Sequence, residues 1–254
     1  MSRLVSKVAL ITGGAQGIGE ACVRRFVAED ARVLIGDVKL EKGAALAAEL
    51  GDSVLFQELD VTSEDQFAVA IAMAVETWGR FDILVNNAAA IFPAAPLEET
   101  TNEEFDRLMA VNVRGVFLGS KLAYPHLKQS RGCVVNISSM AGVTGQADHA
   151  VYGATKGAVN ALTKCAATDW GQDGVRVNSI CPACVLTEAT FQSCAQQPDP
   201  DAALAQLDKI HLLGRAAEPA EIAAAVAFLA SDDASFITGC NLPVSGGSEC
   251  GYNM

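Results

Sequence analysis

The sequence predicts an α/β fold in which a doubly wound parallel sheet carries helices on both faces. Short apolar runs alternate with helix-length amphipathic segments along the chain of 254 residues, which is typical of a parallel sheet. The runs ALIT, VLIG and ILV are almost continuously apolar, which indicates strands that are buried on both faces. Because no repeat, low-complexity tract or linker interrupts the pattern, we expect a single domain spanning residues 1–254.

The first half of the chain contains four predicted strands and three predicted helices. The strands are expected at 7–13, 32–37, 54–60 and 81–87, and the helices at 17–30, 39–50 and 63–79. Ile18, Cys22 and Phe26 recur on one face of the first helix, and a glycine ends the second. Ser63 with Gln66 suits a capping box at the start of the third helix.

The second half contains three further strands and longer helices. The strands are expected at 132–139, 175–182 and 239–247, the helices at 101–129, 150–171 and 218–232, and two short helical pieces within 187–211. Segment 101–129 follows a proline-containing loop and is expected to be one uninterrupted helix. Good helix formers fill 150–171, and Pro219 marks the start of the last helix.

The charge balance excludes two kinds of partner. The formal net charge is −12 and the sequence pI is about 4.6, whereas nucleic acid and anionic membranes bind clustered Lys and Arg. No uninterrupted apolar stretch reaches the length of about 18 residues that a membrane helix needs. The first apolar run stops at Gly13 and indicates a strand rather than a signal peptide. We therefore expect a soluble cytoplasmic protein, with no nucleic acid or membrane partner, that binds a small molecule.

Eight cysteines are present, most of them inside apolar elements, and this usage fits a reducing cytosol. Cys181 and Cys184 form a C-x-x-C sequence. A thiol redox site needs a low-pKa cysteine at a helix start, and a zinc site needs a second pair of ligands, which the sequence lacks. We interpret the spacing as a coincidence and expect no metal.

Three glycines, Gly13, Gly17 and Gly19, connect the first strand to the first helix. In such a turn, glycines allow a tight bend and let backbone amides approach a pyrophosphate, to which the helix N-terminus adds its positive dipole end. A plain tight connection is the alternative. The position directly after the first strand of an α/β chain favours a dinucleotide site.

Asp37 ends the second strand, where a carboxylate binds the two hydroxyls of an adenosine ribose. The same carboxylate would repel a 2′-phosphate. Gln16 and Val38 supply no cation for such a phosphate, and Lys39 is the one cation that the sequence places nearby. NAD is therefore the predicted cofactor.

Tyr152 and Lys156 stand four positions apart in the helix predicted over 150–171. This spacing places both side chains on one helix face, within reach of each other. The pair is either part of an exposed helix surface or an acid/base device, and the spacing alone does not decide between them.

Seven motifs follow one another along the chain: TGGAQGIG (12–19), DV (60–61), NNAA (86–89), VNVRGVF (111–117), NISS (136–139), YGATK (152–156) and CPACVLT (181–187). In this order they resemble the short-chain dehydrogenase/reductase family over the whole chain. The resemblance implies a Rossmann-like sheet of about seven strands and a nicotinamide cofactor. It also implies a catalytic set consisting of Asn112, Ser139, Tyr152 and Lys156.

The resemblance further implies contacts to the cofactor, with adenine at Asp60 and Val61 and the nicotinamide carboxamide around Val185 and Thr187. The residues expected to bind NAD are Gly13, Gln16, Gly17, Ile18, Gly19, Asp37, Asp60, Val61, Asn87, Tyr152, Lys156, Pro182, Val185 and Thr187.

The resemblance also gives the tyrosine–lysine pair a role. A free tyrosine titrates at about pH 10, and the Lys156 ammonium and a positive nicotinamide ring would both favour the phenolate. Tyr152 would take the alcohol proton as hydride leaves, and would act as the acid in the reverse direction. Ser139 would orient the reacting oxygen, Lys156 would also hold the nicotinamide ribose, and Asn112 would hold a water that links Lys156 to bulk solvent.

Three positions depart from the family pattern. Ala89 and Ala183 stand where the family usually has glycine, which gives backbone freedom, and Ser245 stands where aspartate is frequent. These changes remove no catalytic group, but the two alanines put the shape of the pocket in question. Cys181 and Cys184 would lie near the nicotinamide, where thiol oxidation would inhibit the enzyme.

The family places its substrate lid at 187–213, where prolines and small polar residues suit a mobile flap. The segment has almost no positive charge, so a strongly anionic substrate lacks a clamp. Phe92, Gln146 and His149 are expected on the substrate side, and His149 either binds a substrate hydroxyl or is a solvated loop residue. We expect a neutral secondary alcohol or ketone as substrate, such as a polyol, a sugar or a small hydroxyketone.

The family usually forms homotetramers through the helices at 101–129 and 151–171, so a homotetramer is expected here. Three other functions remain as alternatives. An NAD-binding sensor without turnover would show a broken catalytic set, a dehalogenase on this scaffold would lack the glycine motif, and a thiol redox protein would need more than an isolated C-x-x-C. The intact set of motifs favours the enzyme.

Overall fold

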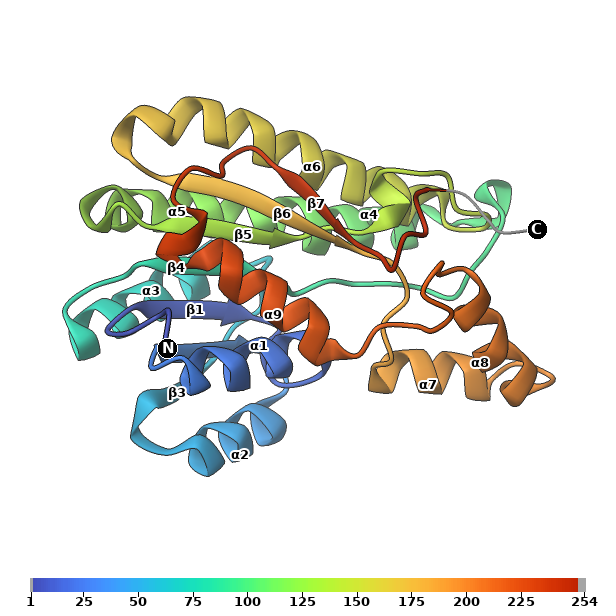
Figure 1. Cartoon of the computed structure of the whole chain (residues 1–254), viewed down its shortest axis with the longest axis horizontal. Helices are drawn as coiled ribbons and strands as arrows, with labels where there is room; N and C mark the ends of the chain where they lie inside the picture. The colour runs from blue at the N-terminus through green and yellow to red at the C-terminus, as the bar shows by residue number, and fades with distance from the viewer. Residues whose placement is uncertain (1, 251–254) are drawn as a thin grey trace.

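In the computed structural model, which describes residues 2–250, seven strands form one sheet in the order β3-β2-β1-β4-β5-β6-β7 (Figure 1). The strands are β1 (Val8–Thr12), β2 (Arg32–Asp37), β3 (Val54–Glu58), β4 (Ile83–Asn86), β5 (Cys133–Ile137), β6 (Arg176–Pro182) and β7 (Asn241–Val244). All six pairings are parallel. The strand order reverses between β1 and β4, which confirms the predicted doubly wound sheet and places a binding crevice at the carboxyl ends of these strands.

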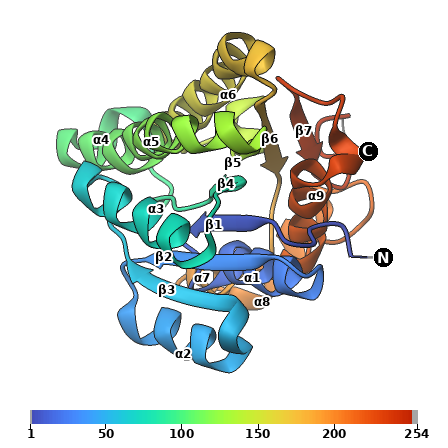
Figure 2. The ribbon, with the colours of Figure 1, turned by 90° about the vertical axis from the view of Figure 1, so that its left-hand side faces the viewer.

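Helices cover both faces of the sheet. They are α1 (Gly17–Ala28), α2 (Leu40–Leu50), α3 (Glu64–Trp78), α4 (Asn102–Met109), α5 (Gly115–Ser130), α6 (Ala150–Trp170), α7 (Glu188–Ala195), α8 (Pro200–Lys209) and α9 (Pro219–Ala230). Viewed along the sheet, α1, α2 and α9 lie on one side and α3, α5 and α6 on the other (Figure 2).

Two hydrophobic cores form, one on each face of the sheet. Ala9 and Ile11 of β1 belong to the core under α1 and α9, whereas Val8 and Leu10 belong to the core under α3 and α5. Successive side chains of a strand point to opposite faces, so a strand between two cores must be apolar at nearly every position. This requirement explains the unbroken apolar runs in the sequence.

The segment predicted as one helix over 101–129 is helical from Asn102 to Ser130, but its hydrogen bonding changes within it. Between α4 and α5 lies a turn of π-helix at Ala110–Arg114, and such turns occur frequently at functional sites. Asn112 lies in the middle of this turn, and its side chain bonds to the backbone of Ala90. The predicted long helix is therefore confirmed, but the sequence did not indicate the π-helical turn at a predicted catalytic residue.

Two other local predictions need correction. The last strand is shorter than the predicted 239–247, because Gly239, Gly246 and Gly247 adopt left-handed backbone conformations that lie outside β7. Ser63 Oγ does accept a hydrogen bond from the backbone N–H of Gln66 at 3.3 Å, but the Gln66 side chain accepts from the Asp60 N–H at 2.6 Å. The predicted capping box is therefore half formed, and the other half holds the loop at Asp60.

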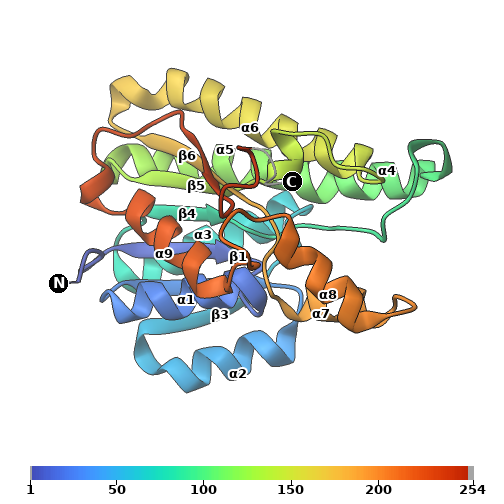
Figure 3. The ribbon, with the colours of Figure 1, turned by 45° about the vertical axis from the view of Figure 1, so that its right-hand side comes forward.

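The helices α7 and α8 project beyond the carboxyl ends of the strands, on the same side as the loop that precedes α4 (Figure 3). They are the two helical pieces predicted within 187–211. Among residues 2–250, no helix has the length and apolar character that crossing a bilayer requires.

Candidate active site

Tyr152 and Lys156 lie on the first turns of α6 and face the end of β5. The Lys156 ammonium nitrogen lies 5.6 Å from the centroid of the Tyr152 ring. Lys156 is only 3% exposed, and its Nζ donates a hydrogen bond to the carbonyl oxygen of Ile137 at 2.8 Å. The pair is therefore not an exposed helix surface, which excludes the first of the two alternatives that the spacing left open.

Burial lowers the pKa of Lys156 to about 8, because a charged ammonium loses hydration when it leaves water. The Ile137 carbonyl replaces only part of that hydration. At neutral pH the side chain is still mostly protonated, so the site contains a positive charge held by a backbone carbonyl.

Burial raises the pKa of Tyr152 above its ordinary value, and a hydrogen bond with Ser139 opposes the shift only in part. This differs from the expected lowering of the pKa by Lys156. In the protein alone, the loss of hydration of the phenolate outweighs the effect of the nearby ammonium. The free protein thus holds Tyr152 as an acid, and the positive ring of an oxidised nicotinamide would be needed to favour the base.

The two serines after β5 have separate environments. Ser138 Oγ is buried and donates to the carbonyl of Lys156 at 3.0 Å, so Ser138 fixes α6 against the sheet. Ser139 Oγ accepts from the N–H of Ala141 at 3.1 Å and hydrogen-bonds Tyr152. Ser139 is therefore the serine whose hydroxyl is available beside the tyrosine.

Asn112 is buried and connects three segments. Its Oδ1 accepts from the N–H of Ala90 at 2.7 Å, and its Nδ2 donates to the Ala90 carbonyl at 2.9 Å and to Thr155 Oγ1 at 3.2 Å. Both amide protons are therefore used. The geometry supports a positioning role, in which Asn112 holds the loop after β4 against α6, rather than direct binding of water through its N–H groups.

The glycine turn is closely packed. Gly13 and Gly17 have φ values of +62° and +58°, which L side chains rarely adopt, and a Cβ on Gly19 would lie 2.0 Å from the Gly13 carbonyl oxygen. Asn87 Nδ2 donates to the carbonyls of Thr12 and Gly13, both at 2.9 Å. The cradle therefore admits only glycine at these points, as binding of a pyrophosphate by backbone N–H groups requires.

Thr12 is a site residue that the sequence analysis missed. Its hydroxyl accepts from the N–H groups of Asn87 and Ala88 at 3.0 and 3.1 Å. It thereby joins the ends of β1 and β4, where the strand order reverses. Asn87, which was expected to bind the cofactor, uses both side-chain protons to hold this turn.

Asp37 is buried at the end of β2. Its two carboxylate oxygens accept from the N–H groups of Ala15 and Lys39, each at 2.9 Å. Nearby, the ammonium groups of Lys39 and Lys42 approach Gln16 Oε1 at 2.6 and 3.4 Å. The carboxylate is thus fixed at the end of β2, and two ammonium groups lie at Gln16, of which that of Lys42 was not expected from the sequence.

The remaining predicted residues also lie along the carboxyl edge or directly behind it. Ile18 packs against the core, and Asp60 accepts two hydrogen bonds from Thr62. Val185 forms an isolated bridge with Ala217 after Pro182 ends β6. Thr187 caps α7 and lies 3.5 Å from where a Cβ on Gly17 would stand. These residues therefore lie around the carboxyl ends of the strands, where the cofactor site is predicted.

The two unusual alanines cause no backbone strain. Ala89 and Ala183 are both absent from the non-glycine residues with left-handed φ, which are Ser6, Asp30, Arg131 and Asp148. The backbone conformation therefore does not require glycine at either position.

The two cysteines of the C-x-x-C are poor thiolates. Burial raises the pKa of both thiols, that of Cys184 to about 11. Cys181 Sγ contacts Asn160 Oδ1 at 3.6 Å, whereas the backbone N–H of Cys184 bonds to His211. The pair lacks the lowered pKa of a redox site, and residues 2–250 contain no group of three metal-ligating side chains that could hold an ion.

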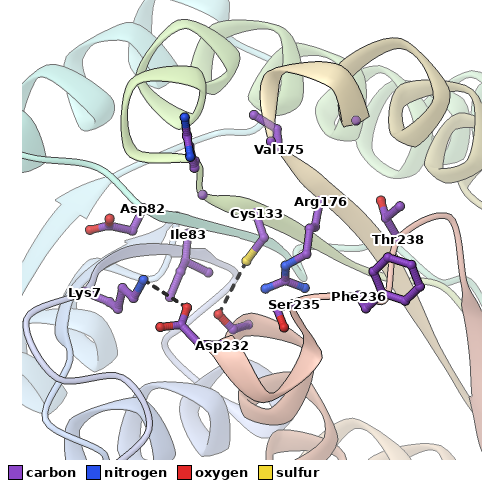
Figure 4. Close-up of a pocket in the computed structure, with 15 residues that line it drawn as sticks. Lys7, Asp82, Ile83, Cys133, Val175, Arg176, Asp232, Ser235, Phe236 and Thr238 are labelled. Atoms are coloured by element: carbon purple, nitrogen blue, oxygen red, sulfur yellow. Dashed lines mark hydrogen bonds and ion pairs between the residues drawn. The ribbon is translucent and has the colours of Figure 1, made fainter.

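A separate cavity of about 450 Å³ lies at the opposite, amino edge of the sheet (Figure 4). Lys7, Cys133 and Arg176 are among the residues that line it. The Arg176 guanidinium donates to the carbonyls of Leu229 and Ser231 at 2.7 and 3.1 Å, so it ties β6 to the end of α9. None of the predicted site residues lines this cavity, so the chemistry belongs to the carboxyl edge.

Comparison with known proteins gives consistent matches. A family model described as enoyl-(acyl carrier protein) reductase matches residues 13–249. An L-fucose dehydrogenase of Oryctolagus cuniculus is 45% identical over 98% of this chain and 87% of its own length. A meso-2,3-butanediol dehydrogenase of Serratia marcescens is 42% identical over 97% of this chain and 96% of its own length.

A solved structure is also similar to this chain over nearly its whole length. The crystal structure of a 3-ketoacyl-(acyl-carrier-protein) reductase from Brucella melitensis, complexed with NADH, superposes with a TM-score of 0.88 at 34% identity. The match covers 96% of this chain and 99% of that chain. The residues that the family model matches include both the glycine cradle and the tyrosine–lysine helix.

We predict that Lys156→Met stabilises the protein. The folded pKa of about 8 lies below the ordinary 10.5, so the unfolded chain binds more protons than the folded chain between these pH values. The substitution should raise the free energy of unfolding at pH 7 by on the order of 2 kcal/mol, and the gain should shrink as pH rises from 8 toward 10.5.

Urea denaturation without cofactor at pH 7 and pH 10 measures this difference. Comparison of the variant with wild type at each pH cancels the titration of other groups. A variant that is less stable than wild type at pH 7 would contradict the assignment of a buried charge.

Proposed function

The chain belongs to the short-chain dehydrogenase/reductase family, and we propose that it transfers hydride reversibly between NAD(H) and a neutral secondary alcohol or ketone. An alcohol/ketone oxidoreductase with a nicotinamide cofactor follows from the relatives. The observation that carries the proposed mechanism is the buried Lys156 ammonium 5.6 Å from the Tyr152 ring, beside Ser139 and the glycine cradle.

Each member of the catalytic set has a proposed task. In the reducing direction Tyr152 donates its phenolic proton to the carbonyl oxygen, and in the oxidising direction the phenolate accepts the alcohol proton. Ser139 donates a hydrogen bond to the same substrate oxygen and orients it. Lys156 favours the phenolate and holds a ribose hydroxyl with a proton that Ile137 does not use. The bound cofactor supplies or accepts the hydride.

The choice of NAD rests on Asp37. Its carboxylate is fixed by the N–H groups of Ala15 and Lys39, which leaves lone pairs for two ribose hydroxyls and repels a 2′-phosphate. The neighbouring Lys39 and Lys42 weaken this repulsion. Both ammonium groups, however, donate hydrogen bonds to Gln16 Oε1, and that of Lys42 also forms an ion pair with Glu188 at 2.6 Å. We therefore propose a preference for NAD that depends on one carboxylate.

The proposed substrate is uncharged. The segment 187–213, which we propose as a mobile lid, carries Glu188, Asp199, Asp201 and Asp208 but a single lysine. An anionic substrate would meet acidic groups there rather than a clamp. Relatives named for L-fucose and meso-2,3-butanediol support a polyol, sugar or small hydroxyketone.

Two properties outside the site complete the proposal. All eight cysteines are free thiols, which supports a cytoplasmic location. Phe105 on α4 and Phe117 on α5 are 45% and 49% exposed, and we propose that such side chains are covered in a homotetramer through the helices α4, α5 and α6.

Light scattering of the purified protein tests the proposed assembly. We expect a mass of four copies, with Phe117→Asp shifting the population toward smaller species. A monodisperse monomer would contradict the homotetramer.

We predict that Tyr152→Phe lowers kcat/KM by about 10²- to 10⁴-fold and leaves NAD binding intact, because only the proton carrier is removed. Since burial raises the pKa of Tyr152, most of the tyrosine stays protonated from pH 7 to pH 9 while the small phenolate fraction grows with pH. Alcohol oxidation by the wild type should therefore become faster over this range, and ketone reduction should stay nearly constant. Absorbance of the reduced cofactor, measured with a panel of secondary alcohols, polyols and aldoses, records both effects.

Calorimetry with NAD provides the control for the Tyr152 variant. Tight NAD binding with no turnover of any alcohol would instead favour a non-catalytic NAD sensor.

We predict that Asp37→Ser raises the NADP/NAD ratio of kcat/KM by roughly tenfold or more, because the carboxylate repulsion is removed while Lys39 and Lys42 remain. Adding Lys42→Met should reverse part of the gain. The exposed Asp52, outside the cradle, gives a matched control in Asp52→Ser, which should leave the ratio unchanged. A wild-type enzyme that already prefers NADP would overturn the role of Asp37.

A further inference from the structure

We propose that His149 selects substrates that carry a second hydroxyl on the carbon next to the reacting one. The Nε2 atom of His149 accepts a hydrogen bond from that neighbouring hydroxyl, so the preferred substrates are vicinal diols, sugars or α-hydroxyketones. This inference rests on the proposed function and deepens it, because it names the group that distinguishes one neutral alcohol from another.

His149 lies immediately before α6, one helical turn ahead of Tyr152. The centroids of the two rings are 6.3 Å apart, and the ring planes meet at 74° in an edge-to-face arrangement. His149 is half-buried, so its ring is neither inside the core nor free in solvent. The imidazole therefore borders the Tyr152 ring, and the proposal places the carbon next to the reacting one beside this imidazole.

The hydrogen bonds of the imidazole define which nitrogen is available. Nδ1 lies 2.9 Å from the carbonyl oxygen of Ala147, and a carbonyl only accepts, so Nδ1 carries the proton. In the neutral ring, Nε2 then keeps its lone pair. Nε2 has no hydrogen-bond partner among the described residues, and it is therefore an acceptor that suits a hydroxyl donor.

The backbone holds this ring in place. Asp148 adopts a left-handed conformation with φ of +58°, which is uncommon for a residue with a side chain and occurs frequently at functional sites. Its carbonyl accepts from the N–H of Ala95 at 2.9 Å, which joins the loop before α6 to the loop after β4. His149 is thus a positioned residue rather than a solvated loop histidine.

Charge supports the same class of ligand. The Nε2 lone pair and the adjacent Asp148 carboxylate both disfavour a carboxylate or phosphate at this point. A hydroxyl can donate to Nε2 without bringing charge. The site therefore recognises a neutral polar neighbour of the reacting carbon.

The test compares substrates that differ by one hydroxyl. Meso-2,3-butanediol is paired with 2-butanol, and L-fucose with its 2-deoxy analogue, using wild type, His149→Phe and His149→Gln. Phenylalanine keeps a ring but removes the acceptor, whereas the terminal amide of glutamine restores an acceptor near the Nε2 position. His126→Phe is the matched control. His126 lies on α5, outside the site, and its ring packs against that of Phe81 at a centroid distance of 6.3 Å.

In at least one pair, the wild type should prefer the compound with the second hydroxyl. His149→Phe should lower kcat/KM for that compound by about tenfold, the size of one hydrogen bond, and leave kcat/KM for its deoxy partner and KM for NAD unchanged. His149→Gln should recover part of the loss, and His126→Phe should behave as wild type.

Two results separate the failure of this inference from that of the proposed function. If the wild type turns over both members of a pair and His149→Phe slows both equally, the selection by His149 is wrong and the oxidoreductase stands. If the wild type turns over no member of either pair and no alcohol of the wider panel, the proposed function fails and this inference fails with it.

Discussion

The buried ammonium of Lys156 is the constraint on which the rest of the site depends. A charge at 3% exposure needs a partner, and the partner here is the Ile137 carbonyl at the end of β5. That bond fixes the start of α6 against the sheet, and Tyr152 is positioned one turn earlier as a consequence. The lowered pKa of Lys156 shows that the arrangement costs stability. In the proposed mechanism a negative phenolate forms beside this ammonium, which gives the cost a reason.

Buried polar side chains, rather than apolar contacts alone, set the orientation of α6. Asn86 donates to Asn136 Oδ1 at 2.9 Å, and Asn136 donates to Thr163 Oγ1 at 2.9 Å, so β4, β5 and α6 are joined in sequence. Apolar packing tolerates small rotations of a helix, whereas hydrogen bonds in a buried setting have directions and are costly to break. Asn112 extends the same principle to Thr155 through the π-helical turn. The result is a helix whose catalytic face has one rotational setting.

The sequence predicted the features that depend on local order and failed on those that depend on distant contacts. Apolar periodicity and glycine positions are local, so the strands, most helix boundaries and the cradle could be predicted. The π-helical turn arises because Asn112 bonds to Ala90, 22 residues earlier, and no local pattern encodes this. The approach of Lys42 to Gln16 depends on how α2 packs. The raised pKa of Tyr152 follows from burial, which only the folded chain determines.

The two halves of the site differ in how firmly they are built. The cofactor half is held by bonds among Thr12, Gly13 and Asn87 at the centre of the sheet. The segment after β6, which we propose as a lid, is tied to α2 by the exposed ion pair of Lys42 with Glu188. Exposed pairs of this kind contribute little to stability, so this tie costs little free energy to break. The proposed lid can therefore rearrange at small cost while Tyr152 and Lys156 stay in place on α6.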